Sequence, residues 1–346
     1  MKKICLIIPY FGIFPNYFNF WLKSCEYNTS IDWLIITDNN FETSADNIKI
    51  VNIEWNSFVE YVQSKYNFKI SLRSPYKLCD YRPAYGEIFQ KYLYGYDFWG
   101  HCDMDVIWGD LRSYITDDLL KNYDRLFRYG HLSLYKNSPH INSLYRQNVE
   151  SVKYDYKYIF SHPENYIFDE DGITYRSRFK EFIYSFVPLK LLEPIYKTTG
   201  GMYTICKELK IRQCLNVYYD DVRQNQKSFT STRCVANYKL EELKKMPCLF
   251  KFAEGHLFRI NWDANEIIES ETMYAHFQKR KLSVKTNNYN NYYVIPNSFV
   301  PTSEGLEKYK EQCSYTLFYG HYIGIRFHNL KRIIKKKFYG KSCINR

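Results

Sequence analysis

The stretch at residues 98–110 constrains the fold more than any other part of this 346-residue chain. It reads FWGHCDMDVIWGD, an apolar and aromatic run that reaches two aspartates, Asp103 and Asp105, and then continues with apolar residues. In a β-strand, side chains two residues apart point to the same face. Both carboxylates would then lie at the edge of a hydrophobic core, where two like charges are costly unless a cation lies between them. The pattern predicts a site for Mn²⁺ or Mg²⁺, which favour carboxylate and phosphate oxygens and would hold a diphosphate there.

A pair of aspartates one residue apart is a weak signal by itself, because two neighbouring acids often form only a solvated turn. Here the apolar flanks on both sides favour the metal site. The alternative is that the pair caps the next helix, a role for which Asp110 is better placed.

The net charge of +11 is concentrated at the end of the chain. Residues 321–346 hold eight basic side chains and no acidic one, which leaves about +3 for the rest. This distribution argues against a nucleic-acid partner for the body of the protein. Residues 327–338 place apolar side chains on one helical face and lysines away from it, which predicts a basic amphipathic helix on an anionic membrane surface. An ordinary C-terminal helix docked on the body is the alternative.

Composition indicates a globular chain with a substantial core, as one large domain or two closely joined ones. The ten cysteines show neither a C-x-x-C pair nor zinc-ligand spacing, which indicates buried thiols in a reducing compartment. Pro9 interrupts the first apolar run and no small-residue cleavage site follows, so we expect no signal peptide. We therefore expect a cytoplasmic protein, attached peripherally to the inner face of the cell membrane through its tail.

Short apolar runs alternate with segments of helical spacing over the first 125 residues. Strands are predicted at 3–8, 33–37, 48–53 and 98–102, and helices at 17–27, 58–66 and 83–93. This alternation predicts an α/β fold with a mostly parallel sheet flanked by helices. Ligands bind such sheets beyond the carboxyl ends of the strands. We expect Pro9, Tyr10 and Asp38, which lie at strand ends, to contact a nucleotide there together with Asp103.

The pattern loosens after about residue 120. A strand is predicted at 127–135, a helix at 142–150, a hairpin at 252–268 with its turn at 263–265, and a short strand at 273–277. The most loop-like stretch, 287–291, separates the body from a C-terminal extension.

Two further segments, at 77–82 and 276–280, offer candidate site residues. Lys77, Asp80 and Arg82 precede the helix predicted at 83–93 and would contact the nucleotide, with Asp80 accepting from a ribose or base and Arg82 facing phosphate or sugar. The alternative is that Asp80 caps the helix and Arg82 is solvated. His276 is a candidate third metal ligand, although a lone histidine is more often structural. Lys279 and Arg280 would neutralise a departing diphosphate.

Asp169 and Glu170, in the acidic loop FDEDG at 168–172, are candidate catalytic carboxylates. A base that deprotonates a hydroxyl needs a carboxylate held close to it. An acidic surface turn is the equally plausible alternative. The segment GHLSLY at 130–135 would line a sugar pocket or form a buried strand with one polar residue.

With these residues placed, the chain resembles the GT-A-fold, D-x-D glycosyltransferases, and more closely a poorly characterised bacterial group encoded among capsule and lipopolysaccharide genes. The resemblance spans most of residues 1–282 and is carried by the segments IIPYFG at 7–12, KLCDYRP at 77–83, GHCDMD at 100–105, GHL at 130–132 and HFQKR at 276–280. It implies a GT-A-type, Rossmann-like sheet. It also implies that Asp105 binds the metal, that Asp103 contacts the ribose and the metal shell, that Asp80 lies near the nucleoside and that His276 completes the metal site.

The resemblance implies no catalytic base and no stereochemical outcome. We expect a metal-dependent hexosyltransferase that moves a sugar from a nucleotide sugar, such as a UDP-sugar, to a surface polysaccharide or a lipid-linked glycan. The expected parts are a nucleotide-sugar-binding half at 1–125, an acceptor-binding half of the same domain at 126–290 with mixed α+β structure, and the extension at 291–346 with the basic helix.

Two other functions stay open. A nucleotidyltransferase or related phosphotransferase would also pair two carboxylates on a metal, but it would normally need a glycine-rich phosphate loop, and none follows the first strand. A non-catalytic nucleic-acid-binding protein would use the basic tail.

Overall fold

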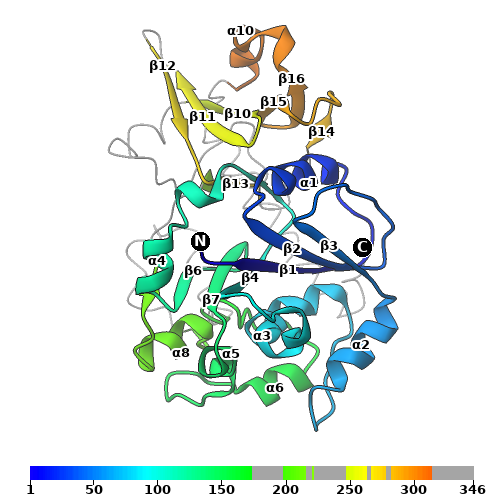
Figure 1. The fold of residues 1–346 in the computed structure, drawn as a ribbon, viewed down its shortest axis with the longest axis vertical. Helices are drawn as coiled ribbons and strands as arrows, with labels where there is room; N and C mark the ends of the chain where they lie inside the picture. Colours follow the sequence, from blue (N-terminus) through cyan, green and yellow to red (C-terminus); the bar gives the residue numbers. More distant parts are fainter. Residues whose placement is uncertain (174–197, 216–219, 222–246, 263–265, 278–281, 314–346) are drawn as a thin grey trace, which may run out of the picture.

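The computed structural model describes residues 1–173, 198–215, 220–221, 247–262, 266–277 and 282–313 (Figure 1). The strands are β1 (Ile4–Tyr10), β2 (Ile31–Thr37), β3 (Ile48–Asn52), β4 (Phe98–Cys102), β5 (Val106–Trp108), β6 (Arg125–Tyr129), β7 (Leu132–Lys136), β8 (Gln213–Cys214), β9 (Asp220–Asp221), β10 (Cys248–Ala253), β11 (His256–Trp262), β12 (Ile267–Glu271), β13 (Tyr274–His276), β14 (Ser283–Val284), β15 (Asn291–Ile295) and β16 (Ser298–Pro301).

The α-helices of these residues are α1 (Phe18–Tyr27), α2 (Trp55–Gln63), α3 (Tyr85–Ile88), α4 (Asp117–Asn122), α5 (Pro139–Asn142), α6 (Tyr156–Ser161), α8 (Met202–Glu208) and α10 (Leu306–Lys310). Short 3₁₀ segments connect them, namely η1 (Pro75–Ala84), η2 (Gln90–Tyr92), η3 (Leu111–Ser113), η4 (Leu144–Arg146), η7 (Thr302–Glu304) and η8 (Glu311–Cys313).

A seven-stranded sheet forms the centre of the molecule, in the order β3-β2-β1-β4-β7-β6-β8. Strands β3, β2, β1 and β4 are parallel, β7 runs antiparallel to both β4 and β6, and β8 is parallel to β6. The expected α/β class, with a mostly parallel sheet flanked by helices, is confirmed. The first four strands lie close to the residue ranges predicted from the sequence, because each is an apolar run bounded by turn residues.

Strand β1 shows how the central sheet divides the core. Cys5 and Ile7 face one cluster, built with α2, α3, α5, α6 and α8. Ile4, Leu6 and Ile8 face the other, built with α1 and α4. Figure 1 shows α2, α3, α5 and α6 on one side of the sheet and α1 on the other. Because alternate strand residues point to opposite faces, a continuous apolar run buries side chains in both layers, each worth about 1.5–3 kcal/mol.

A second sheet of six strands, in the order β12-β11-β10-β15-β16-β14, lies above α1 in Figure 1. One of its faces packs Phe250 and Phe299 against Phe20 of α1. The other face packs Tyr293 and Val300 against Tyr309 of α10. In this sheet β10, from before position 290, pairs with β15, from after it. In the central sheet β4, from before position 125, pairs with β7, from after it. The three expected parts of the chain therefore share their sheets.

Three predicted elements differ from the observed ones. The segment 83–93 forms the end of η1, the short α3 and η2 in place of one helix, and Gly86 in its middle packs so closely that a Cβ would meet Trp99 Nε1 at 2.6 Å. The segment 127–135 forms the hairpin β6–β7, which turns at Gly130. In place of the helix predicted at 142–150, the chain forms α5, which begins earlier because Ser138 caps it and Pro139 starts it, and then the short segment η4.

The other predictions for the second half have mixed outcomes. The short strand at 273–277 is confirmed as β13, and the 252–268 segment forms antiparallel strands with a turn at Glu254 and Gly255. The turn predicted at 263–265 and the basic helix at 327–338 lie outside the described residues. Within the described ranges, no helix combines the length and the apolar character needed to cross a membrane.

Candidate functional site

A cavity of about 830 Å³ lies at the carboxyl ends of β1 and β4. Pro9 and Tyr10 at the end of β1 line it, and so do Asp103 and Asp105, which directly follow β4. Further polar lining residues come from η1, from the β6–β7 turn, from the loop at 165–170 and from β13, among them Arg82, His131, Asn165, Asp169, Glu170 and His276. The edge of the sheet at which the sequence predicted a nucleotide therefore holds a cavity large enough for one.

The two aspartates of the D-x-D pair lie in the short turn between β4 and β5, beyond the end of the strand. Their convergence comes from this bend and not from the strand pleat that the sequence argument assumed. The main chain is held on both sides, because Asp103 N donates to His131 O and Phe277 N donates to Asp105 O. The turn thus presents both carboxylates to the cavity.

His276 joins the aspartates through strand pairing. β13 runs antiparallel to β5, and His276 lies opposite Val106. His276 Nε2 is 3.5 Å from Asp105 Oδ1, and one ligand atom from each of Asp103, Asp105 and His276 lies within 4.8 Å of the others. Two carboxylates and one imidazole suit Mn²⁺ well, and carboxylates suit Mg²⁺. The three residues predicted as metal ligands are therefore brought together, and their chemistry fits the ion.

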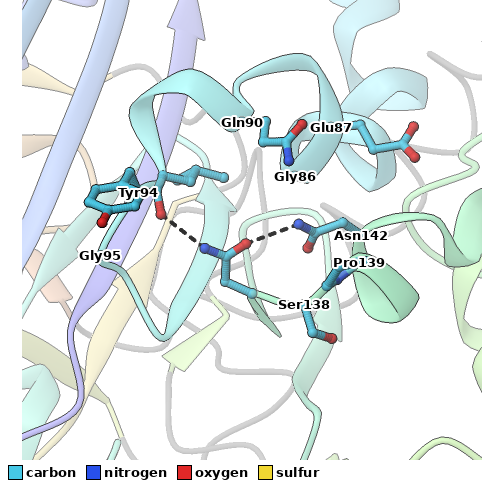
Figure 2. Close-up of a pocket in the computed structure, with 10 residues that line it drawn as sticks. Gly86, Glu87, Gln90, Tyr94, Gly95, Ser138, Pro139 and Asn142 are labelled. Carbon is cyan, nitrogen blue, oxygen red and sulfur yellow. Dashed lines mark hydrogen bonds between the residues drawn. The ribbon is translucent and has the colours of Figure 1, made fainter.

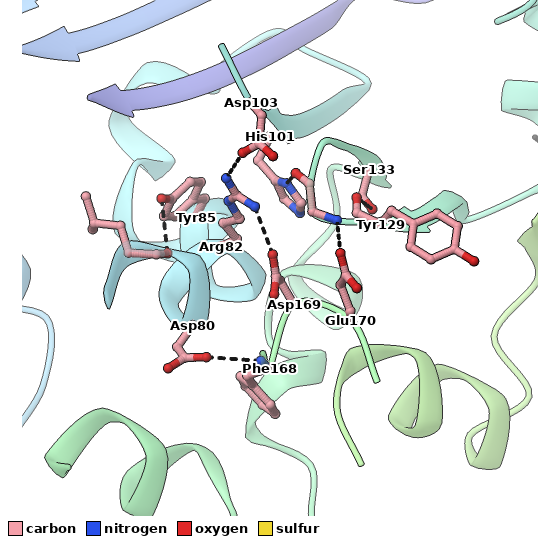
Figure 3. A network of polar contacts seen from close by, with 12 residues as sticks. Asp80, Arg82, Tyr85, His101, Asp103, Tyr129, Ser133, Phe168, Asp169 and Glu170 are labelled. Carbon is pink, nitrogen blue, oxygen red and sulfur yellow. Dashed lines mark hydrogen bonds and ion pairs between the residues drawn. The ribbon is translucent and has the colours of Figure 1, made fainter. Parts of the chain in front are cut away.

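Arg82 connects the metal-ligand cluster to the acidic loop (Figure 3). Its Nη2 donates to Asp103 Oδ1, and its Nη1 donates to Asp169 Oδ2 at 2.9 Å. The side chain of Arg82 is only 13% exposed. From the sequence, Arg82 was expected either to be solvated or to face phosphate or sugar. In the structure Arg82 bridges two carboxylates, those of Asp103 and Asp169, at the wall of the cavity.

These contacts set the pKa values of the two aspartates in opposite directions. Burial works to raise the pKa of Asp103, but the Arg82 guanidinium and the nearby His276 and His131 hold it well below its ordinary value. Burial raises the pKa of Asp169 to about 7, against the opposing charge of Arg82 and with help from neighbouring Glu170. Asp103 therefore stays ionised at neutral pH, whereas Asp169 is poised to exchange a proton there.

Glu170 is held by the turn of the β6–β7 hairpin. Gly130 N donates to Glu170 Oε1 at 2.8 Å. Figure 3 draws the bond that Glu170 accepts as a dashed line. Burial raises the pKa of Glu170, although the hydrogen bond from Gly130 works in the other direction. For the acidic loop the sequence allowed either a catalytic role or a surface turn. In the structure this loop places both Asp169 and Glu170 at the cavity.

Lys77 and Asp80 do not reach the cavity. Lys77 Nζ lies 2.7 Å from Asp80 Oδ2, and both side chains are almost wholly buried. The Asp80 carboxylate accepts main-chain hydrogen bonds from Tyr166 and Phe168. Neither residue is placed to contact a nucleotide, and Asp80 does not cap a helix, because η1 runs through it from its N-cap at Ser74.

The remaining predicted residues have separate positions. Asp38 is exposed at the end of β2, accepts a hydrogen bond from Gly12 N at 3.1 Å and does not line the cavity. Lys279 and Arg280 lie outside the described residues. Asp110 caps η3, since its carboxylate accepts from Arg112 N and Ser113 N, as its position in the sequence indicated.

Two cavity residues carried no signal in the sequence. Asn165 lines the cavity, and its Oδ1 is buried without a hydrogen-bond partner. Ile167 lines it too, 45% exposed and in the left-handed region at φ 54°. His131, which the sequence offered only as part of a possible sugar pocket, contacts His276 with the two rings tilted and their centroids 4.3 Å apart. Its Nδ1 is hydrogen-bonded with Tyr274 Oη at 2.9 Å.

A smaller cavity of about 350 Å³ lies between α3 and α5 (Figure 2). Its amide groups bond to one another and to the main chain: Asn142 Nδ2 donates to Asn137 Oδ1, and Asn137 Nδ2 donates to Leu93 O. Asn142 Oδ1 also accepts from Trp99 Nε1. These bonds hold the loops before β4 and after β7, so we interpret this cavity as a structural feature of the fold.

The fold and the site define a mixed α/β protein with a candidate metal centre at the carboxyl edge of its parallel strands. The chain belongs to a family of unknown function, DUF6625, whose model matches residues 6–303. No curated protein matches the chain.

Solved structures with some likeness to the chain are two of the galactosyltransferase LgtC and one of the glycosyltransferase GlyE. The LgtC complex with donor and acceptor sugar analogues has 13% identity and a TM-score of 0.27, over 46% of this chain and 66% of LgtC. A structure of LgtC with a substituted active site has 11% identity and a TM-score of 0.34, over 81% and 88%. Apo GlyE from Streptococcus pneumoniae TIGR4 has 10% identity and a TM-score of 0.24, over 46% and 42%.

Proposed function

We propose that this protein is a metal-dependent glycosyltransferase of the hexosyltransferase type, which transfers a sugar from a nucleotide sugar such as a UDP-sugar. The observation that carries the proposal is the cluster of Asp103, Asp105 and His276 in a cavity at the carboxyl edge of parallel strands. Nucleotides bind α/β sheets at this edge, and two carboxylates with an imidazole suit a divalent ion. The resemblance of the surrounding segments to D-x-D glycosyltransferases supports the same reading.

In this proposal Asp105 and His276 bind the ion, and Asp103 lies between the ion and the ribose. A bound divalent ion neutralises the diphosphate as it leaves. Pro9 and Tyr10 line the same cavity and contact the nucleotide. Arg82 holds Asp103 ionised and in place.

Asp169 and Glu170 are the candidates for the base that accepts the proton of the attacking hydroxyl. Both line the cavity, and burial raises the pKa of each carboxyl toward the range in which a base works at neutral pH. Asp169 is held by Arg82 and Glu170 by Gly130 N, so each carboxylate has a defined position.

The acceptor in this proposal is a bacterial surface polysaccharide of the capsule or lipopolysaccharide type, or a lipid-linked glycan at the inner membrane face. The resemblance to glycosyltransferases encoded among capsule and lipopolysaccharide genes supports a surface polysaccharide as the acceptor. The eight basic residues of 321–346, without an acid among them, support contact with an anionic lipid surface.

Thermal denaturation with a panel of nucleotide sugars, each with and without Mn²⁺, tests the proposal. We expect one nucleotide sugar to raise the melting temperature only when Mn²⁺ is present, because the ion bridges protein and diphosphate. A flat response to every nucleotide sugar would contradict the proposal.

The variants for this test are the double substitution Asp103→Asn with Asp105→Asn, and Asp118→Asn as the control. Asp118 is a surface carboxylate on α4, 87% exposed. The double variant loses the Mn²⁺-dependent shift and sugar transfer, whereas the control keeps both. Sugar transfer that survives in the double variant would exclude this metal site from the reaction.

A further inference from the structure

The buried pair of Lys77 and Asp80 is satisfied entirely by protein groups. Lys77 is 2% exposed and Asp80 is wholly buried. Lys77 Nζ donates to Asp80 Oδ2 at 2.7 Å and to the main-chain oxygens of Ile159 at 2.9 Å and of Glu164. A buried ion pair is tolerated only when such further bonds satisfy both partners. The pair is therefore part of the packing behind the cavity wall.

Asp80 uses its carboxylate to hold the loop at 165–170 (Figure 3). Tyr166 N donates to Asp80 Oδ1 and Oδ2 at 3.1 and 3.0 Å, and Phe168 N donates to Oδ1 at 3.0 Å. Hydrogen bonds from main-chain N–H groups to an ionised carboxylate are about twice as strong as neutral ones. One buried charge thus fixes two alternate amides of the same loop.

Ile167, between those two amides, has a backbone conformation that needs this support. Its φ is 54°, in the left-handed region that a β-branched residue rarely adopts. Such a conformation persists only where the surrounding structure holds it. The Ile167 carbonyl in turn accepts from Glu170 N at 3.2 Å and Gly172 N at 2.9 Å, so the bend carries directly into the acidic loop.

The next two residues after Phe168 are the two carboxylates of the cavity, Asp169 and Glu170. Their main chain is fixed from the other side as well, because Met202 N donates to Phe168 O at 2.8 Å and Tyr203 N donates to Glu170 O at 3.0 Å. A shift of Phe168 N away from Asp80 moves the Asp169 carboxylate, whose bond to Arg82 is directional.

We infer that Asp80, fixed by Lys77, is a positioning residue that sets the place of Asp169 and Glu170 in the cavity and does not itself contact the donor. This role rests on the proposed glycosyltransferase function for its catalytic consequence, but the structural part stands without it. It replaces the nucleoside contact that the sequence suggested, because the Asp80 carboxylate is wholly buried and is already bonded by Lys77, Tyr166 and Phe168.

The test compares the full-length protein with Asp80→Asn and Asp155→Asn. Asp155 is the matched control, since its carboxylate also accepts a main-chain hydrogen bond, from Tyr158 N at 2.7 Å, but at the N-cap of α6. Three quantities are measured: hydrogen exchange of peptides covering 165–172, the dissociation constant of the nucleotide sugar with Mn²⁺, and kcat with KM for sugar transfer.

We expect Asp80→Asn to speed hydrogen exchange at 165–172 by about tenfold or more, because the amide offers Tyr166 N and Phe168 N a single neutral oxygen in place of a charged carboxylate. We also expect kcat to fall by about tenfold or more while the donor dissociation constant stays within about twofold. Asp80→Glu, which keeps the charge, should recover part of both losses. Asp155→Asn should leave exchange at 165–172 and kcat unchanged.

A donor dissociation constant that rises about tenfold with unchanged exchange at 165–172 would overturn the inference and return Asp80 to the nucleoside. Unchanged exchange with unchanged kcat would overturn it too. If the native protein transfers no sugar, the proposed function fails, and the exchange data alone still decide whether Asp80 holds the loop. Should Asp80→Asn not fold, Asp80→Glu is compared in the same way, with faster exchange at 165–172 and unchanged donor affinity expected.

Discussion

Gly130 lies directly against the guanidinium of Arg82. A Cβ on residue 130 would meet Arg82 Nη1 at 2.5 Å and Asp169 Oδ2 at 2.7 Å. Gly130 does not have a positive φ. A larger residue is therefore excluded at position 130 by these two contacts and not by the backbone conformation. The Arg82–Asp169 ion pair therefore packs directly against the turn of the β6–β7 hairpin.

The first prediction concerns Gly130→Ala. The added methyl group should displace Arg82 or Asp169 and lower the free energy of unfolding by about 1–3 kcal/mol, the usual cost of overpacking. Urea denaturation measures this loss, and sugar transfer should fall with it. In an Arg82→Ala background the same substitution clashes only with Asp169 Oδ2, whose side chain is no longer held by the arginine, so its effect there should shrink. Equal losses in both backgrounds would mean that the contact with Arg82 is not the cause.

The second prediction concerns Arg82 itself. Arg82→Ala leaves Asp103 and Asp169 without their shared cation in a buried setting, so the free energy of unfolding should fall by about 3–5 kcal/mol at neutral pH. Arg82→Lys should recover little, because one ammonium does not reproduce the two-sided contact of a guanidinium. The control is Arg212→Ala, which removes the two hydrogen bonds that an exposed arginine donates to Asp124. Its cost should be far smaller than that of Arg82→Ala in the same urea titration, because water screens an ion pair at the surface. Similar costs for Arg82→Ala and Arg212→Ala would show that the buried bridge has no special role.

The third prediction is a pH dependence of stability caused by Asp169. Its folded pKa, about 7, lies above the ordinary 3.8, so between these values the folded protein binds more protons at this position than the unfolded chain. The stabilising contribution of this carboxyl is complete below about pH 4 and is lost as the pH rises through about 7. Asp169→Asn does not titrate. The difference in unfolding free energy between native protein and Asp169→Asn should therefore decrease from pH 4 to pH 8, measured by urea denaturation. A difference that grows with pH would have the opposite sign and contradict the assignment.

The fourth prediction concerns the metal centre. His276→Ala removes the imidazole from the set formed with Asp103 and Asp105, and Mn²⁺ affinity should fall by about tenfold or more. Titration of free Mn²⁺ by electron paramagnetic resonance measures this without any sugar transfer. His140→Ala is the matched control, because His140 is exposed on α5. Equal Mn²⁺ affinity in the His276→Ala variant and the native protein would remove His276 from the ligand set.

The fifth prediction separates the two candidate bases. If the base has the raised pKa of Asp169, kcat should increase as the pH rises through about 7, because only the ionised carboxylate accepts a proton. Asp169→Asn should then lose this rise of kcat and most of the activity, whereas Glu170→Gln should keep both. The opposite pattern would assign the role to Glu170. Full activity in both variants would remove the acidic loop from the chemistry.

The first half of the fold follows from local sequence patterns. Strands β1 to β4 are apolar runs between turn residues, and the D-x-D pair stands out because its flanks are apolar. The β6–β7 hairpin was harder to foresee, since its two strands are short and only Gly130 and His131 lie between them. The second sheet was also hidden, because β10 pairs with β15 across a long stretch of chain whose local pattern does not show the partner.

What the sequence determined by itself was the α/β class, the edge of the sheet where polar residues gather, and the pair of Asp103 and Asp105. These depend on burial patterns and chain order, which are local properties. Only the tertiary structure decided which distant side chains meet that pair. The register of β13 against β5 brings His276 to Asp105. The position of the 165–170 loop turns Asp80 from an expected nucleoside contact into a buried acceptor for Tyr166 and Phe168. A carboxylate's role depends on which donors surround it in space, and those donors come from segments far apart in the chain.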